Sequence, residues 1–143
     1  MFMNGVLGGL VGITAGADQM SPMDAVLIGL IAGVIIVLGV ALIDRLKLDD
    51  PVGAVAVHLI CGIWGTLAVG IFGELAGLDQ VLIQLAGIGI IGAFSAISAT
   101  IIILIVKAIT GGSIRVSKEE ELKGLDLAEH GMDAYADFRI NQH

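Results

Sequence analysis

Four long stretches of this 143-residue chain contain no Asp, Glu, Lys or Arg, and they constrain its fold more than any other feature. They run over residues 1–17, 25–43, 51–73 and 80–106. A helix needs ~20 apolar residues to cross the ~30 Å core of a bilayer, with a range of ~17–25. The second and third runs fit, the fourth crosses if it is tilted, and the first is at the lower limit. The chain is therefore predicted to be an all-α membrane protein with four transmembrane helices.

The composition agrees with a membrane protein and excludes other classes. Hydrophobic residues make up 57% of the chain and charged residues 15%, whereas soluble domains are ~45–50% apolar and ~25% charged. Seven Lys+Arg residues without a basic patch argue against a nucleic-acid partner. A single cysteine, Cys61, excludes an internal disulfide framework. The first run lacks a basic segment before it, so we do not expect it to be a secretory signal peptide.

The charges between the runs predict the orientation. Two connections are acidic and carry no base, whereas all seven basic residues lie in the remaining connection and after the fourth run: Arg45, Lys47, Lys107, Arg115, Lys118, Lys123 and Arg139. Excess Lys and Arg marks cytoplasmic loops. We therefore expect a multi-pass protein of the cell membrane with both termini in the cytoplasm. Residues 1–108 form the transmembrane region and 109–143 a cytoplasmic tail.

The tail is polar and is predicted to contain short helices. Ser117 and Glu120 have the spacing of a helix-capping box. Apolar residues recur through the tail, which favours docking on the membrane region or on a partner over a solvated, disordered tail: Ile114, Leu122, Leu125, Leu127, Met132, Tyr135 and Phe138. His130 and His143 are expected at its solvated surface.

Small residues recur at four-residue spacing in all four runs, which predicts close packing of the helices. Helices in lipid gain little from the hydrophobic effect, so they depend on close backbone approach. The sets are Gly8, Gly12 and Gly16; Gly29 and Gly33; Gly62, Thr66 and Gly70; and Gly92, Ala96 and Thr100. Glycine-rich spans also occur in proton-translocating rotor subunits, but those need a carboxylate inside a span, and none of these runs has one.

The third run begins with a helix-start signal and contains the only histidine of the four runs. Asp50 is suited to cap free N–H groups, Pro51 to occupy the first helical position, and Asp49 to place negative charge at the positive end of the helix dipole. His58 follows seven residues after Pro51, ~10 Å along an α-helix.

His58 is the candidate functional residue of the chain. One interpretation is that it only hydrogen-bonds to a neighbouring helix. The other is that it lines a path for a proton or a small polar solute, because ionisable side chains at membrane depth usually face a cavity. Helical spacing places four small residues beside it, which would leave room for such a path: Ala54, Cys61, Gly62 and Gly65. No metal site is expected, since Cys61 is the only other possible ligand in these runs.

The third run also resembles a known family. "LDDPVGAVAVHLICGIWGTLAVGIFG", from Leu48, is similar to a late transmembrane helix of the ammonium transporters, the Amt/Mep/Rh family. "NGVLGGLVGITAGAD" from Asn4 resembles the helix two places earlier, "VLIQLAGI" from Val81 the start of the last helix, and "RVSKEEELKGLDLAEHGMDAY" from Arg115 the cytoplasmic tail. The resemblance covers essentially the whole chain in the same order.

The resemblance implies a fold and an activity. Family members have eleven transmembrane helices, assemble as trimers, and conduct ammonium or ammonia through a narrow pore in each subunit without a cofactor. They are not enzymes. This chain corresponds to the last four helices and the tail, and His58 to the second of two facing pore histidines. Asp49, Asp50 and Pro51 then stand at the start of the pore helix.

The same resemblance implies that much of the pore is missing from this chain. The first repeat, with the partner histidine and the residues that gather the cation, has no counterpart here. The chain is therefore expected either to work together with the missing helices or to be a non-transporting fragment or regulatory subunit whose tail docks a PII-type signal protein. Ala128 stands where some plant relatives have a regulatory threonine, so that switch is absent.

Overall fold

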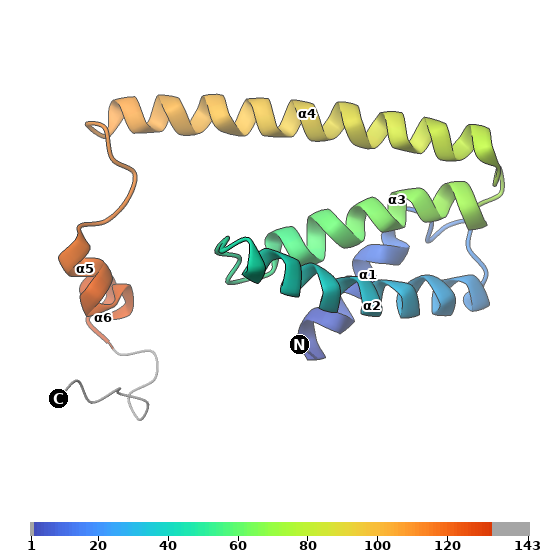
Figure 1. The fold of residues 1–143 in the computed structure, drawn as a ribbon, viewed down its shortest axis with the longest axis horizontal. Coiled ribbons are helices and arrows are strands. Elements are labelled where there is room, and N and C mark those ends of the chain that lie inside the picture. Colours follow the sequence, from blue (N-terminus) through green and yellow to red (C-terminus); the bar gives the residue numbers. More distant parts are fainter. Residues whose placement is uncertain (1, 133–143) are drawn as a thin grey trace. The chain divides into compact units, whose positions relative to one another are not determined.

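The structure is a computed structural model that describes residues 2–132, and every regular element in that range is a helix (Figure 1). The all-α prediction is thus confirmed. The helices are α1 (Phe2–Thr14), α2 (Pro22–Arg45), the π-helix η1 (Ala54–Ile60), α3 (Cys61–Phe72), α4 (Leu78–Ile109), α5 (Lys118–Lys123) and α6 (Leu125–His130). The chain forms two compact units, Met1–Ser95 and Ala96–His143.

Within residues 2–132, three helical segments are long and apolar enough to cross a membrane. They are α2 with 24 residues, η1 and α3 together with 19, and α4 with 32. The first run gives only the 13-residue apolar helix α1, because the chain turns after Thr14. In that turn the N–H of Gly16 donates to Ile13 O, and the N–H of Met20 donates to Gly16 O.

One stripe of α2 forms the centre of the first unit. Its fully or nearly fully buried residues recur every three or four positions, as one helix face requires: Ile28, Ala32, Ile36, Gly39 and Ile43. The stripe packs against α1, η1 and α3, and Val57 of η1 and Cys61 of α3 join it in the core. The other faces of α2 expose apolar side chains such as Leu30 and Leu38, as expected for a helix in lipid or against further helices.

Glycines allow the backbones of α1 and α3 to touch. A Cβ added at Gly65 would lie 2.5 Å from the carbonyl oxygen of Gly12 and 3.1 Å from that of Val11. A Cβ at Gly12 would lie 3.1 Å from the Cβ of Ala32 on α2. The three helices therefore meet where Gly12 and Gly65 lack side chains. Gly12 belongs to the small-residue set predicted for the first run, whereas Gly65 lies outside the set predicted for the third.

The spacing does not predict contacts everywhere. A Cβ added at Gly29, Gly33 or Gly92 would meet nothing within 4 Å. Within the described residues, α4 buries no side chain completely, although a Cβ at Gly70 of α3 would lie 2.9 Å from the backbone of Val81 at the start of α4. Gly29 and Gly33 of α2 and Gly92 of α4 thus have no partner helix among the described residues.

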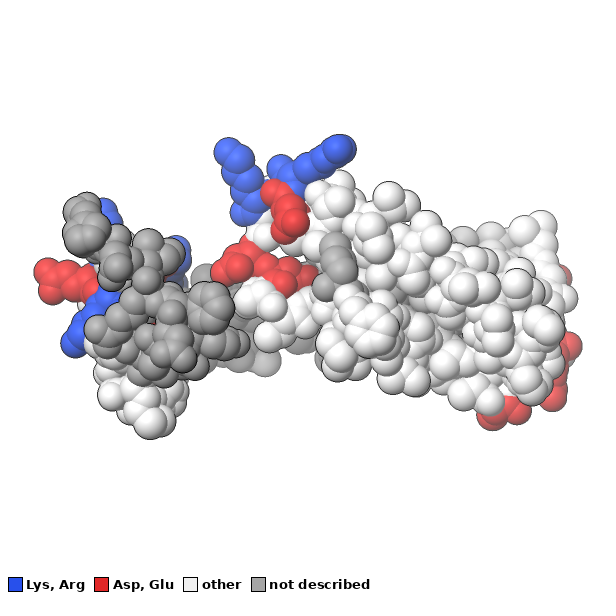
Figure 2. Space-filling model, turned by 90° about the horizontal axis from the view of Figure 1, so that it is seen from below, with Lys and Arg blue, Asp and Glu red and all other residues white. Residues whose placement is uncertain are grey.

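The two acidic connections lie at the same end of the first unit. Gln19, between α1 and α2, accepts a hydrogen bond through Oε1 from the N–H of Glu74, between α3 and α4, at 3.2 Å. Figure 2 shows acidic side chains at this end (right) and an uncharged flank beside them. Arg45 and Lys47 follow at the opposite end of α2, so the charge asymmetry found in the sequence holds along the helix axes.

The helix of the third run begins at Ala54, three residues later than the sequence suggested. Pro51 lies in a turn, and Gly53 has a positive φ of 71°, a conformation that favours glycine. The Asp50 carboxylate accepts hydrogen bonds from the N–H of Ala56 at 2.9 Å and of Val55 at 3.1 Å. It thus serves two of the first N–H groups, which have no partner inside the helix.

The described part of the tail contains α5 and α6, which pack on each other. The hydroxyl of Ser117 accepts a hydrogen bond from the N–H of Glu120, whose carboxylate accepts one from the N–H of Ser117, forming the expected capping box. The hydrogen bonds from Ser117 hold the pKa of Glu120 below its usual value. Tyr135, Phe138 and His143 lie outside the described residues.

We expect Gly65→Ala to destabilise the first unit by ~1–3 kcal/mol. The added methyl group would press against main-chain atoms of Gly12 and Val11 in α1, which cannot move aside as a flexible side chain can. Chemical unfolding in detergent, followed by circular dichroism, measures this. Gly33→Ala is the matched control: it meets open space and should be neutral or stabilising by up to ~1 kcal/mol. Equal effects of the two substitutions would contradict the close approach.

We also expect the ionisation of Asp50 to make the stability of the folded chain depend on pH. Because its pKa in the folded chain lies below the ordinary value of 3.8, its contribution is present at neutral pH and is lost as the pH falls below 3.8. Asp50→Asn should therefore lower the midpoint of thermal unfolding in detergent at pH 7. The difference in this midpoint between the variant and the native chain should shrink below pH 3.8. Asp49→Asn is the control. A pH-independent difference for Asp50→Asn would contradict the assignment.

Candidate functional site

His58 is the fifth residue of η1, and its side chain is exposed. It is flanked on one side by Ala56 and Val57, which are buried in the core of the first unit. The imidazole therefore points away from the contact between α1, α2 and α3. His58 is the one histidine on the apolar, membrane-length segment Ala54–Phe72, which contains no Asp, Glu, Lys or Arg.

The small residues expected beside His58 do not all share its side of the helix. Ala54 is exposed like His58, whereas Cys61 and Gly65 are buried against the other helices. Of the four, Cys61 and Gly65 therefore contribute to the core of the first unit rather than to the exposed side that carries His58. The reason is the π-helix, whose hydrogen bonds span five residues rather than four, so side chains on either side of it do not follow the α-helical period.

The π-helix is fixed at its first residues. Besides the two hydrogen bonds to Asp50, the N–H of Val57 donates to the carbonyl oxygen of Gly53 at 2.7 Å. Short π-helical segments are rare in proteins and frequently occur at functional sites. Asp50 and Gly53 precede the helix and accept hydrogen bonds from its first N–H groups. We therefore expect them to influence the orientation of His58.

The electrostatics at this helix start favour an ionised Asp50. The N–H of Ala56 is the largest influence that lowers its pKa; partial burial opposes it, and the N–H groups of Val55 and Ala54 add to the lowering. Asp49 precedes it and is exposed. Asp50 is thus a helix-capping carboxylate in this structure, and Pro51 belongs to the turn before the helix.

Two side chains of α3 donate hydrogen bonds across to α2, and sequence reasoning did not find them. The indole Nε1 of Trp64 donates to the carbonyl oxygen of Ile28 at 3.1 Å. The thiol of Cys61 lies 3.9 Å from the carbonyl oxygen of Ala32, one turn further along α2. The signal was a lone tryptophan in an apolar run, because a buried indole N–H needs an acceptor.

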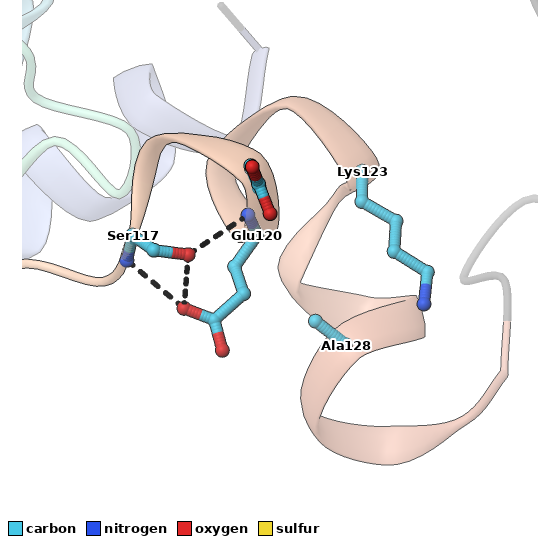
Figure 3. A pocket seen from close by; sticks show the side chains of 5 residues that line it. Ser117, Glu120, Lys123 and Ala128 are labelled. Carbon is cyan, nitrogen blue, oxygen red and sulfur yellow. Dashed lines mark hydrogen bonds between the residues drawn. The ribbon is translucent and has the colours of Figure 1, made fainter.

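The chemistry that this site supports is limited. A neutral imidazole offers one donor and one acceptor, which suits proton relay or guidance of a small polar molecule. Among residues 2–132, no group of three or more His, Cys, Asp or Glu side chains is placed to hold a metal ion. An open hollow in the tail, about 350 Å³, is lined by Ser117, Glu119, Glu120, Lys123 and Ala128 (Figure 3). It belongs to the second unit, and His58 to the first.

Comparisons with known proteins identify the family. The sequence model described as Ammonium Transporter Family matches residues 1–135. A relative from Synechocystis sp. is 46% identical over 129 residues, which are 90% of this chain and 28% of the relative. Ammonium transporter Amt2 of Methanocaldococcus jannaschii is 40% identical over 139 residues, which are 92% of this chain and 32% of the relative.

A solved structure has the same fold. The crystal structure of Candida albicans Mep2 superposes with a TM-score of 0.72 and 28% identity, and the match covers 82% of this chain and 29% of that one. The chain therefore spans about a third or less of the proteins it matches, and its fold is a part of theirs. With the family model matching nearly its whole length, the chain belongs to the Ammonium Transporter Family.

Proposed function

We propose that this chain forms one wall of an ammonium- or ammonia-conducting pore, with His58 lining the path. The observation that carries the proposal is an exposed imidazole on an apolar, membrane-length helical segment of a chain that belongs to the ammonium transporters. An ionisable group at this depth is stable when it faces a polar cavity rather than lipid. Asp50 supports the path indirectly, by fixing the start of the helix that carries His58.

The proposed pore needs more helices than this chain provides. His58 is open on one side, and α4 has no fully buried side chain among its 32 residues. Polar groups exposed to hydrocarbon cost several kcal/mol each unless they are covered. We propose that the covering helices are those of the remaining two thirds of the family fold, supplied by the same or by a companion polypeptide, and that the assembly is a homotrimer.

The membrane orientation is part of the proposal. The acidic end, near Gln19 and Glu74, faces outward, and the end with Arg45 and Lys47 faces the cytoplasm of the cell. The tail after Ile109 then lies in the cytoplasm, where it is available to a signal protein of the PII type. In the described tail, Leu122 and Met132 are 75% and 70% exposed, which leaves apolar surface for such a partner.

The second candidate is a fragment that does not conduct, with the tail as its working part. The exposed apolar side chains of the tail, Leu122 and Met132, favour it, because they leave surface for a partner. The two candidates differ in one measurable property. The first requires flux that depends on His58, whereas the second requires only that the tail bind its partner.

The test is uptake of labelled methylammonium by transporter-deficient cells. We expect no uptake with this chain alone, because the pore is open to lipid, and uptake when it is expressed beside a polypeptide that carries the missing family helices. In that pairing, His58→Ala should change the rate of uptake or the discrimination against potassium about tenfold, by analogy with the loss of one buried polar partner.

Leu59→Ala is the matched control, since it removes a neighbouring exposed side chain without a polar group. Membrane content of each variant is measured by immunoblotting. Uptake and discrimination that are unchanged in His58→Ala would contradict the pore assignment. Failure of the paired chains to take up methylammonium, with both present in the membrane, would favour the second candidate.

A further inference from the structure

The hydrogen bond between Trp64 and Ile28 is unusual among the contacts of the first unit because it fixes one helix against another in a single position. Apolar side chains packed in a membrane can slide or rotate at small cost, since lipid solvates them equally well. An indole N–H in such surroundings needs an acceptor, and here it reaches a main-chain carbonyl of α2 at 3.1 Å. The hydrogen bond therefore fixes the position of α3 along its axis and its rotation about that axis, both relative to α2.

The ring of Trp64 is held on its other side as well. A Cβ added at Gly12 of α1 would lie 3.5 Å from Cδ1 of Trp64, so the indole lies against the bare backbone of α1. The thiol of Cys61 reaches the carbonyl oxygen of Ala32, one turn along the same face of α2, at a long 3.9 Å. Trp64 therefore touches both neighbouring helices at the point where all three meet, and its hydrogen bond is the shorter of the two links.

We propose that Trp64 is a positioning residue for His58. The two residues lie six positions apart on the continuous helical segment Ala54–Phe72. Asp50 and Gly53 fix the beginning of that segment, and Trp64 fixes it against α2 and α1. The imidazole stands between these two points, so its position in the pore depends on both. The expected effect on transport rests on the proposed function. The positioning of His58 by Trp64 does not.

The structural part is tested on the chain itself, in detergent micelles, by nuclear magnetic resonance of the imidazole groups. The chain has three histidines, and His130 and His143 in the tail serve as internal references. Trp64→Phe keeps an aromatic ring and removes the N–H donor. We expect the His58 resonance to shift or broaden beyond its linewidth while the two tail resonances stay in place.

Thr66→Val is the matched control, because the Thr66 hydroxyl donates to Gly62 O within its own helix at 2.9 Å and crosses to no other helix. It should leave the His58 resonance unchanged. Circular dichroism establishes that each variant keeps its helix content, and Trp64→Leu, which also lacks an N–H donor, serves where Trp64→Phe does not fold. An unmoved His58 resonance in folded Trp64→Phe, or an equal shift in Thr66→Val, would overturn the proposal.

The transport part is tested in the paired chains of the methylammonium assay. Trp64→Phe should change the discrimination between methylammonium and potassium by about fivefold, the equivalent of one hydrogen bond, with Trp64→His, which restores a ring N–H, closer to the native value. A purely structural role would lower uptake in proportion to the protein present and leave discrimination unchanged, which would contradict the proposal. If His58→Ala has no effect, the proposed function fails, while the resonance measurement still decides whether Trp64 positions His58.

Discussion

The contact between the backbones of α1 and α3 is the constraint on which the rest of the first unit depends. A side-chain carbon at Gly65 would lie 2.5 Å from the carbonyl oxygen of Gly12, so the two helices meet without side chains between them. In lipid such proximity supplies the van der Waals contacts that the hydrophobic effect does not. It also brings Trp64 within reach of α2, where its N–H finds an acceptor. The helix that carries His58 is oriented by these contacts.

The orientation of the helix that carries His58 explains why an imidazole in an apolar segment is exposed. Cys61 and Val57 are fully buried in the core, whereas His58 between them is exposed. The π-helix allows this, because it breaks the α-helical period over Ala54–Ile60. The single imidazole of the apolar spans is thereby placed on the side of the helix that this chain leaves uncovered. In a protein that belongs to the ammonium transporters and spans about a third of their length, an uncovered polar side is where further helices would complete a path.

Much of the architecture could be predicted from the sequence, and the failures have physical causes. Runs without charge located α2, α3 and α4, because desolvating a charge in lipid is too costly for those segments to contain one. The length of α1 was overestimated because the hydrogen bonds of the turn after Thr14 leave no trace in hydropathy. The faces of the third helix were assigned with the α-helical period, which the π-helix invalidates. The bond from Trp64 to Ile28 joins residues 36 positions apart. A lone tryptophan in an apolar run indicates that its N–H needs an acceptor, but no local pattern identifies Ile28 as that acceptor. The role of His58 stays a prediction, since its side chain is exposed among the described residues.

The most direct measurement of the central claim is the reactivity of position 58 toward a charged, water-soluble thiol reagent in the paired transporter. His58→Cys in a Cys61→Ser background should react, and ammonium should slow the reaction, because the side chain faces a water-accessible path. Val57→Cys in the same background should not react, because Val57 is fully buried. If His58→Cys is as unreactive as Val57→Cys, or reacts at a rate that ammonium does not change, His58 does not line the path and the account is wrong.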